Sequence, residues 1–264
     1  MSSPICNLST ELLLKIFSFV DVNERLKLEE VCKRWCEISK WKWLDIKYVH
    51  LSYKHKSTYI RRVTNRLKVL EIYDTCNSPL LKNVTQYMST FNNLQKFEYS
   101  TVEHVCDNFF CKDTNDLTQI LELLPITLKK FCLHKCILLP TYNIGKFKSL
   151  KHFSYSYPNY LSHELEDVLT NVLESLPDTL ESLHIFGQSL NTKFHIGKLQ
   201  SLKFLWLWSL KLKKNNITGL ESLDKNLEHV RLWGKEIDND YLKQVQKLDC
   251  VKMFTHTQEE KIFA

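Results

Sequence analysis

Hydrophobic residues near the N-terminus recur at the spacing of an α-helix. They stand three or four positions apart, which places them on one helical face, and they are Leu12, Leu13, Ile16, Phe17 and Val20. Ser9 or Thr10 precedes them, and either hydroxyl can accept a hydrogen bond from an orphan backbone N–H as the N-cap. The pattern predicts an amphipathic helix that begins near residue 10.

A second apolar face follows after a polar break at Asp21 and Asn23, which can cap the next helix. This face consists of Leu26, Leu28, Val31, Cys32 and Trp35. A third, short helix is expected through Ile38 and Trp41. A module of about 40 residues cannot bury two such faces internally, because domains this small are marginal without support. We therefore expect part of this surface to contact a partner; a helical hairpin that caps the next domain is the alternative.

The string Val31-Cys32-Lys33-Arg34-Trp35, behind the apolar pattern described above, closely resembles an F-box. The resemblance implies that the module binds a Skp-family adaptor and, through it, a cullin. It also implies a set of residues that pack against the adaptor or form the F-box core: Leu8, Leu12, Ile16, Phe17, Val31, Cys32 and Trp35. The residue types do not apportion these seven between the two roles. The family's opening Leu-Pro is replaced by Leu8-Ser9, and Ser9 can cap the helix instead.

After the helices, the phrase Leu-x-x-apolar-x-apolar returns along the whole chain. Its nine copies begin at Ile46, Leu67, Leu94, Leu128, Leu150, Leu180, Leu202, Leu227 and Leu248. The intervals run from 21 residues (Ile46 to Leu67) to 34 residues (Leu94 to Leu128), mostly in the range of leucine-rich repeats, which these segments resemble. Apolar residues at i and i+2 of a strand share one face, and stacked copies bury that face in a continuous core. A non-repeat α/β domain with leucine-rich strands is the weaker alternative.

The two patterns together predict an α/β fold, with an N-terminal three-helix F-box followed by a leucine-rich-repeat solenoid. The solenoid should be a horseshoe with a parallel sheet on its concave face and with helices over residues 115–124 and 164–176. The expected domains are residues 1–45 for the F-box, 46–257 for about nine irregular repeats, and 258–264 for a C-terminal tail.

Residues that alternate with the inward positions should face the concave side, and aromatic side chains gather in the C-terminal repeats. The predicted substrate-binding residues are Phe186, Phe204, Trp206, Trp208, Arg231 and Trp233. Trp and Arg dominate interface hot spots, and an exposed aromatic patch of this size indicates a partner. Two alternatives stay open. The chain end, residues 259–264, could cover the patch, and the long insertion at residues 103–115 could carry a site instead.

Composition narrows the function classes. The net charge is +6, without a Lys/Arg run, so nothing indicates a nucleic-acid partner. The nine cysteines show no paired spacing, and we expect a protein of the cytoplasm, the nucleus or both, with reduced thiols and no membrane segment.

No catalytic constellation emerges from the sequence. With five glycines there is no phosphate-binding loop, and Cys132, His134 and Cys136 lack a second ligand pair at zinc-like spacing. We expect no catalytic residues, no metal and no cofactor. The resemblance favours a non-catalytic subunit of a ubiquitin ligase that recognises a protein substrate for degradation. The rivals are a leucine-rich-repeat scaffold that acts without a ligase and a thiol-dependent transferase that uses Cys132.

Overall fold

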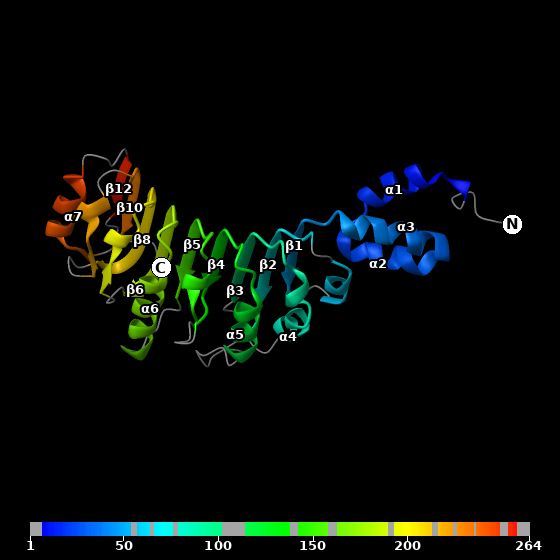
Figure 1. Cartoon of the computed structure of the whole chain (residues 1–264), viewed down its shortest axis with the longest axis horizontal. Coiled ribbons are helices and arrows are strands. Elements are labelled where there is room, and N and C mark those ends of the chain that lie inside the picture. Colours follow the sequence, from blue (N-terminus) through cyan, green and yellow to red (C-terminus); the bar gives the residue numbers. More distant parts are fainter. Residues whose placement is uncertain are drawn as a thin grey trace, which may run out of the picture.

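Three helices open the computed structural model, and a curved parallel sheet follows them (Figure 1). The described residues are 7–53, 57–63, 66–75, 79–101, 114–137, 142–157, 163–189, 193–212, 216–223, 226–234, 236–248 and 253–257. The helices are α1 (Thr10–Ser18), α2 (Val22–Val31) and α3 (Lys33–Leu44). As predicted, Ser9 caps α1: its hydroxyl accepts a hydrogen bond from the Leu12 backbone N–H at 3.3 Å.

The break between α2 and α3 corrects the sequence prediction. Trp35 was expected on the second helix, but Cys32 has an extended backbone (φ −165°, ψ 166°) and Trp35 lies in the first turns of α3. Leu28, Cys32 and Trp35 have the spacing of one continuous helix, and no glycine or proline marks the interruption. The turn at Cys32 brings the Trp35 ring to 5.1 Å from the ring of Phe17, in an edge-on contact. These two side chains, with Leu13 and Ile38, form the small core of the helical module.

Within the described residues, nine strands form one continuous parallel path, in the order in which they occur along the chain. They are β1 (Tyr48–Ser52), β2 (Val69–Asp74), β3 (Lys96–Thr101), β4 (Lys130–His134), β5 (His152–Ser156), β6 (Ser182–Ser189), β8 (Phe204–Leu212), β10 (His229–Trp233) and β12 (Met253–Thr257). The predicted inward residues of the first eight strands are aligned by the register and buried. The solenoid and its parallel sheet are therefore confirmed.

The ninth repeat has a different register from the predicted one. The sequence pattern matched Val251 to Val230, but the sheet pairs Val230 with Phe254, three residues further along. Lys252, which was expected on the concave face, lies outside the described residues. The likeness of the phrase around Leu248 to the earlier copies was misleading because Val251 and Met253 are apolar and two positions apart, whereas pairing with β10 begins only at Met253.

Helices and short segments return the chain along the other face of the sheet, where Figure 1 shows α4, α5 and α6 beneath the strands. The α-helices are α4 (Leu80–Thr85), α5 (Thr114–Leu123), α6 (His163–Ser175) and α7 (Asn239–Gln246), and the 3₁₀ segments are η2 (Ser57–Arg62), η3 (Met88–Thr90), η4 (Ile144–Lys146), η5 (Ile196–Lys198) and η6 (Leu220–Leu223). The strands β7 (Phe194–His195) and β9 (Ile217–Thr218) form a small second sheet, and β11 (Glu236–Ile237) pairs with β8. The helices predicted over 115–124 and 164–176 are confirmed as α5 and α6, each shifted by one residue.

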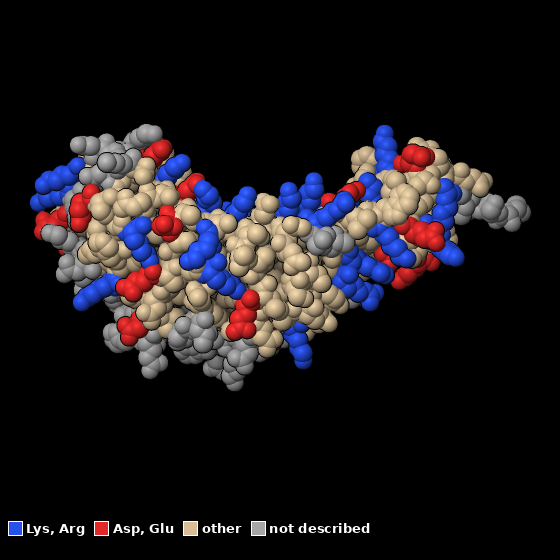
Figure 2. Space-filling model, viewed as in Figure 1, with Lys and Arg blue, Asp and Glu red and all other residues tan. Residues whose placement is uncertain are grey.

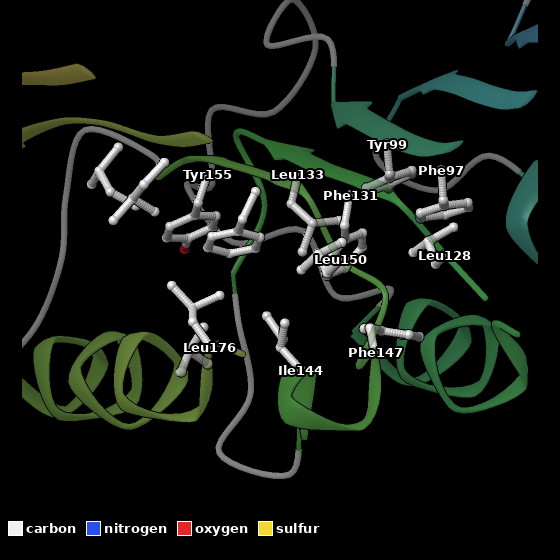
Figure 3. Packing of buried hydrophobic residues seen from close by; sticks show 14 of the residues in the cluster. Phe97, Tyr99, Leu128, Phe131, Leu133, Ile144, Phe147, Leu150, Tyr155 and Leu176 are labelled. Carbon is white, nitrogen blue, oxygen red and sulfur yellow. The ribbon is translucent and has the colours of Figure 1, made fainter. Parts of the chain in front are cut away.

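A continuous hydrophobic core fills the space between the sheet and these returns (Figure 3). Phe131 occupies its middle, with ring centroids 6.1 Å from Phe97, 5.8 Å from Phe153 and 5.7 Å from Phe147. Each repeat thus contacts its neighbours through the same inward positions, as the stacking of incomplete units requires.

The helical module joins the first repeat through a buried polar contact and not through a linker. Trp43, 1% exposed, stacks on Tyr59 of η2 at 6.3 Å, and its indole N–H donates to Glu29 of α2 at 2.7 Å. Arg62 of η2 pairs with the other oxygen of Glu29 at 2.6 Å. Trp41, by contrast, points away from the core and is 57% exposed. Among the described residues, no helix has the length and apolar character needed to cross a bilayer.

Candidate functional site

The helical module exposes large apolar side chains beside its small core. Helix α1 buries Leu13 and Phe17, whereas Leu12 and Ile16, one turn apart, are 50% and 39% exposed. Side chains four positions apart lie on the same face of a helix, so Leu12 and Ile16 form an apolar strip that faces away from the module. Val31, at the end of α2, is 54% exposed as well.

The structure separates the seven residues that the F-box resemblance singled out. Phe17 and Trp35 belong to the core, and Leu8 and Cys32 are partly buried against it. Leu12, Ile16 and Val31 are the exposed members. Phe19, which the sequence analysis did not select, is 81% exposed directly after α1. Its position, as a large apolar residue directly after the last residue of the helix, is the sequence feature that could have indicated its exposure.

The start of the module is held by backbone contacts that the sequence did not reveal. The guanidinium of Arg34, in α3, donates to the backbone carbonyl of Leu8 at 2.6 Å. This bond ties the segment before α1 to α3.

The second candidate site lies on the concave face of the C-terminal repeats, where the predicted aromatic residues come together. Phe186 and Trp206 meet edge to face at 4.9 Å, and Trp208 stacks on Trp233 at 4.9 Å. The guanidinium of Arg231 lies over the Trp206 ring, 5.6 Å from its centroid. The neighbouring strands β6, β8 and β10 thereby bring rings and one cation onto one continuous surface.

Three histidines share this surface, and they are not among the six residues that the sequence predicted to bind a substrate. His184 contacts Trp206 at 5.3 Å and His152 at 4.6 Å, while His229 stacks flat on Phe204 at 4.9 Å. His152 and His229 stand one position before the first inward residue of their strands, and period-two alternation turns this position to the concave side. The same alternation therefore predicts from the sequence alone that they face the concave side.

A groove of about 420 Å³ opens between these side chains. We call it the concave groove, and it is lined by His152, Ser182, His184, Phe204, Leu205, Trp206, His229 and Arg231. Phe204 and Arg231 are exposed, whereas Phe186, Trp206, Trp208 and Trp233 are half-buried. The six residues predicted to bind a substrate therefore lie in or beside one groove.

Two of the groove histidines are held in the neutral form. Burial, with smaller contributions from the neighbouring His184 and Lys130, lowers the pKa of His152 to about 3. Burial likewise lowers the pKa of His184 to about 4, and Lys130 and Arg231 act in the same direction. At neutral pH the imidazoles contribute uncharged donors and acceptors to the groove.

The N-terminal half of the concave face has a different chemistry. Lys96 pairs with Glu71 and, at 2.9 Å, with Glu98. The phenol of Tyr48 donates to Glu71 at 2.6 Å, and that of Tyr73 donates to Glu98 at 2.8 Å. Burial acts to raise the pKa of each carboxyl, but the hydrogen bonds from Lys96 and the phenols outweigh it and hold both pKa values below the usual range. We call this set the ion network.

Cys132 lies in β4 at the centre of the sheet and lacks the properties of a catalytic thiol. It is 3% exposed, and burial raises its pKa to about 12. Reactive thiols have a lowered pKa and are accessible, so the geometry does not support a Cys132-dependent transferase. Cys136 belongs to the buried core of the solenoid. No group of three or more potential metal ligands occurs among the described residues, and Cys106 and Cys111 lie outside them.

The F-box-like family model matches residues 5–47, the segment that forms the three helices. A search of curated proteins found no match. Among solved structures, the chain is similar to an internalin from Listeria monocytogenes, with 14% identity over 89% of this chain and 87% of that chain and a TM-score of 0.30. A score this low does not establish a shared fold. The strand register and the repeated inward positions identify the solenoid, and the chain therefore combines an F-box-like module with a leucine-rich-repeat solenoid.

Proposed function

We propose that this protein is the substrate-recognition subunit of a Skp–cullin–F-box ubiquitin ligase. In this proposal the helical module binds a Skp-family adaptor, which links it to a cullin, and the concave face of the solenoid binds a protein substrate. The observation that carries it is the coincidence of the F-box-like match at residues 5–47 with a module that exposes Leu12, Ile16 and Val31.

The junction between the two parts supports this division of roles. Trp43, Glu29 and Arg62 connect the module to the first repeat through buried contacts. A receptor with this rigid junction holds its substrate at a fixed place relative to a transfer enzyme, and fixed geometry accelerates a reaction. The protein itself would perform no chemistry. Such a complex would act in the cytoplasm, the nucleus or both.

Adaptor binding is tested by a charge placed in the exposed strip of α1. Leu12→Asp should abolish capture of the purified adaptor, because it puts a carboxylate into an apolar interface at little cost to the isolated fold. The matched control is Ile126→Asp, since Ile126 is 67% exposed in a turn of the solenoid, after α5. The control should capture the adaptor as the parent does.

Two outcomes would contradict the proposal. If Leu12→Asp binds the adaptor as tightly as the parent, the helices do not dock through this strip. If affinity purification from cells recovers neither a Skp-family adaptor nor a cullin with the parent chain, the alternative holds, namely a leucine-rich-repeat scaffold that binds a protein without a ligase.

A further inference from the structure

The concave groove has the dimensions and lining of a site for a short piece of polypeptide. It crosses β5, β6, β8 and β10, and parallel strands lie about 4.8 Å apart, so its span is roughly 14 Å. Its volume of about 420 Å³ is within the range of preformed ligand sites. The walls are rings with open faces, and the contacts among Phe186, His184 and Trp206 fix their positions in advance. Preorganised walls reduce the entropic cost of binding.

The charge in and around the groove is positive. Arg231 and Lys130 act on His184, and Lys130 and Lys96 act on His152. Burial and these neighbouring cations are among the largest influences on the two imidazoles. Lys96 is neutralised by the ion network. Arg231 is a groove-lining cation that forms no ion pair with the described part of the chain.

The position of Arg231 favours a carboxylate as its partner. The guanidinium lies over the Trp206 ring and its side chain is exposed, so its N–H groups remain available at the rim of the groove. A carboxylate matches one guanidinium in a bidentate pair. A phosphate carries almost twice the charge and is usually bound by several cations, whereas Arg231 is the only Arg or Lys among the described residues that line the groove.

We propose that the concave groove binds an extended segment of the substrate in which a large apolar or aromatic side chain stands next to an aspartate or glutamate. The apolar side chain packs against Trp206 and Phe186, and the carboxylate pairs with Arg231. This assignment rests on the proposed protein-binding role of the concave face, and it names the sequence chemistry that the face selects.

The test starts with selection of a phage-displayed library of random 12-residue peptides on the intact protein. The selected peptides should combine Phe, Tyr, Trp or Leu with a neighbouring Asp or Glu. The dominant sequence is then synthesised in three forms: the original, one with the acid replaced by its amide, and one with phosphoserine at that position. Affinities are measured by fluorescence anisotropy for the parent protein, for Arg231→Gln and for the control Arg61→Gln, whose side chain is exposed on η2.

Arg231→Gln should weaken the acidic peptide about tenfold and leave the amide peptide unchanged, because the lost pair exists only with the acid. Arg61→Gln should bind all three forms as the parent does. Recovery of no binder, a selection without the acid–apolar pair, or equal affinities for Arg231→Gln and Arg61→Gln would overturn the proposal. So would a phosphoserine peptide that binds about tenfold more tightly than the acidic one.

The C-terminal residues 259–264 are the alternative occupant of the concave groove, because they also combine acidic and apolar side chains. Residues 259–264 contain two glutamates beside Ile262 and Phe263, and they lie outside the described residues. If deletion of 259–264 raises the affinity for the acidic peptide about tenfold, the tail is the occupant and the assignment to a substrate falls.

Adaptor capture is measured on the same preparations. Lost adaptor capture with retained peptide binding defeats the ligase assignment alone, and the reverse result defeats the groove assignment alone.

Discussion

On the N-terminal half of the concave face the charged side chains form ion pairs with one another, whereas on the C-terminal half a cation lies among aromatic rings. Lys96 lies between Glu71 and Glu98 in the first half, and Arg231 lies over Trp206 in the second. In the view of Figure 2, the surface is hollowed between the C-terminal repeats and the N-terminal helical module. Both halves are built on the same inward positions and the same strand register. The difference teaches that the buried inward residues specify the repeat. The concave residues that alternate with them can either pair with one another or remain available to a partner.

The comparison is tested most strongly by removing one cation from each half. Lys96→Met should lower the free energy of unfolding by about 2–3 kcal/mol, because it leaves two carboxylates, 12% and 15% exposed, without their cation. Arg231→Met should cost less than about 0.5 kcal/mol, since its side chain is exposed and no carboxylate depends on it among the described residues. Urea unfolding followed by circular dichroism measures both variants.

Adding Glu98→Gln to Lys96→Met should restore part of the lost stability, because neighbours in one network couple. Equal losses for the two single variants would show that the ion network is not the feature that distinguishes the halves.

The same comparison predicts where partner affinity is concentrated. Trp206→Ala and Trp233→Ala should each cost about 2 kcal/mol of substrate affinity, as truncated hot-spot aromatics do. Tyr48→Ala removes an exposed aromatic from the N-terminal half and should have a much smaller effect. Calorimetric titration with the captured partner gives the affinities, with adaptor binding as the control for folding. Intact substrate binding in a folded Trp206/Trp233 double variant would move the site elsewhere, to the insertion at residues 103–115 in the first instance.

The inward residues of the first eight strands of the parallel path could be predicted from sequence because one physical requirement, burial of one face, acts on each of these repeats. Leu70, Phe131 and Leu205 stand at equivalent positions and are all buried. The six concave residues of the C-terminal half follow from the same alternation. Alternation predicts the face on which a side chain lies, but not its partner on the next strand. The contact between the neutral His152 and His184 and the ion network around Lys96 could therefore be found only in the structure.

Three further features could not be predicted from periodicity. The break at Cys32 has no proline or glycine, and an extended residue between two helices leaves the apolar spacing intact. The apportionment of Phe17 to the core and Leu12 to the surface depends on the angle between helices, which the spacing of one helix does not fix. The predicted register of the last strand was wrong by three residues, because its apolar residues allow more than one alignment with β10.

Lowering the pH should affect the stability of the two halves differently, with a smaller change in the free energy of unfolding than the loss of Lys96. Burial lowers the pKa of His152 to about 3 and of His184 to about 4, whereas an unfolded histidine titrates near pH 6.5. Below pH 6.5 the unfolded chain binds protons that the folded chain does not, so stability falls as the pH drops from about 6.5 to 4. With allowance for their partial exposure we expect a loss of about 1–2 kcal/mol.

The carboxylates of the ion network titrate in a different window. Their pKa values are lowered in the folded state, so their contribution is present above the unfolded value near 4.3 and is lost only as the pH falls below it. The double variant His152→Gln/His184→Gln should flatten the stability profile between pH 4 and 6.5, and Glu71→Gln/Glu98→Gln should leave that slope in place. A slope that persists without the two histidines would assign the acid sensitivity to other groups.

The smallest expected losses of stability come from removing one hydrogen bond in each half. The phenol of Tyr73 donates to the charged Glu98 at 2.8 Å, and Ser182 shares a hydrogen bond with the neutral His184 at 3.1 Å. A bond to an ionised group is roughly twice as strong as one between neutral groups, so Tyr73→Phe should cost about 1 kcal/mol and Ser182→Ala about 0.5 kcal/mol. Thermal midpoints of the two variants, measured at pH 7, decide the order. If Ser182→Ala is the more destabilising change, the hydrogen bonds of the groove are stronger than those of the ion network, and the C-terminal half owes its ring positions to polar contacts more than to packing.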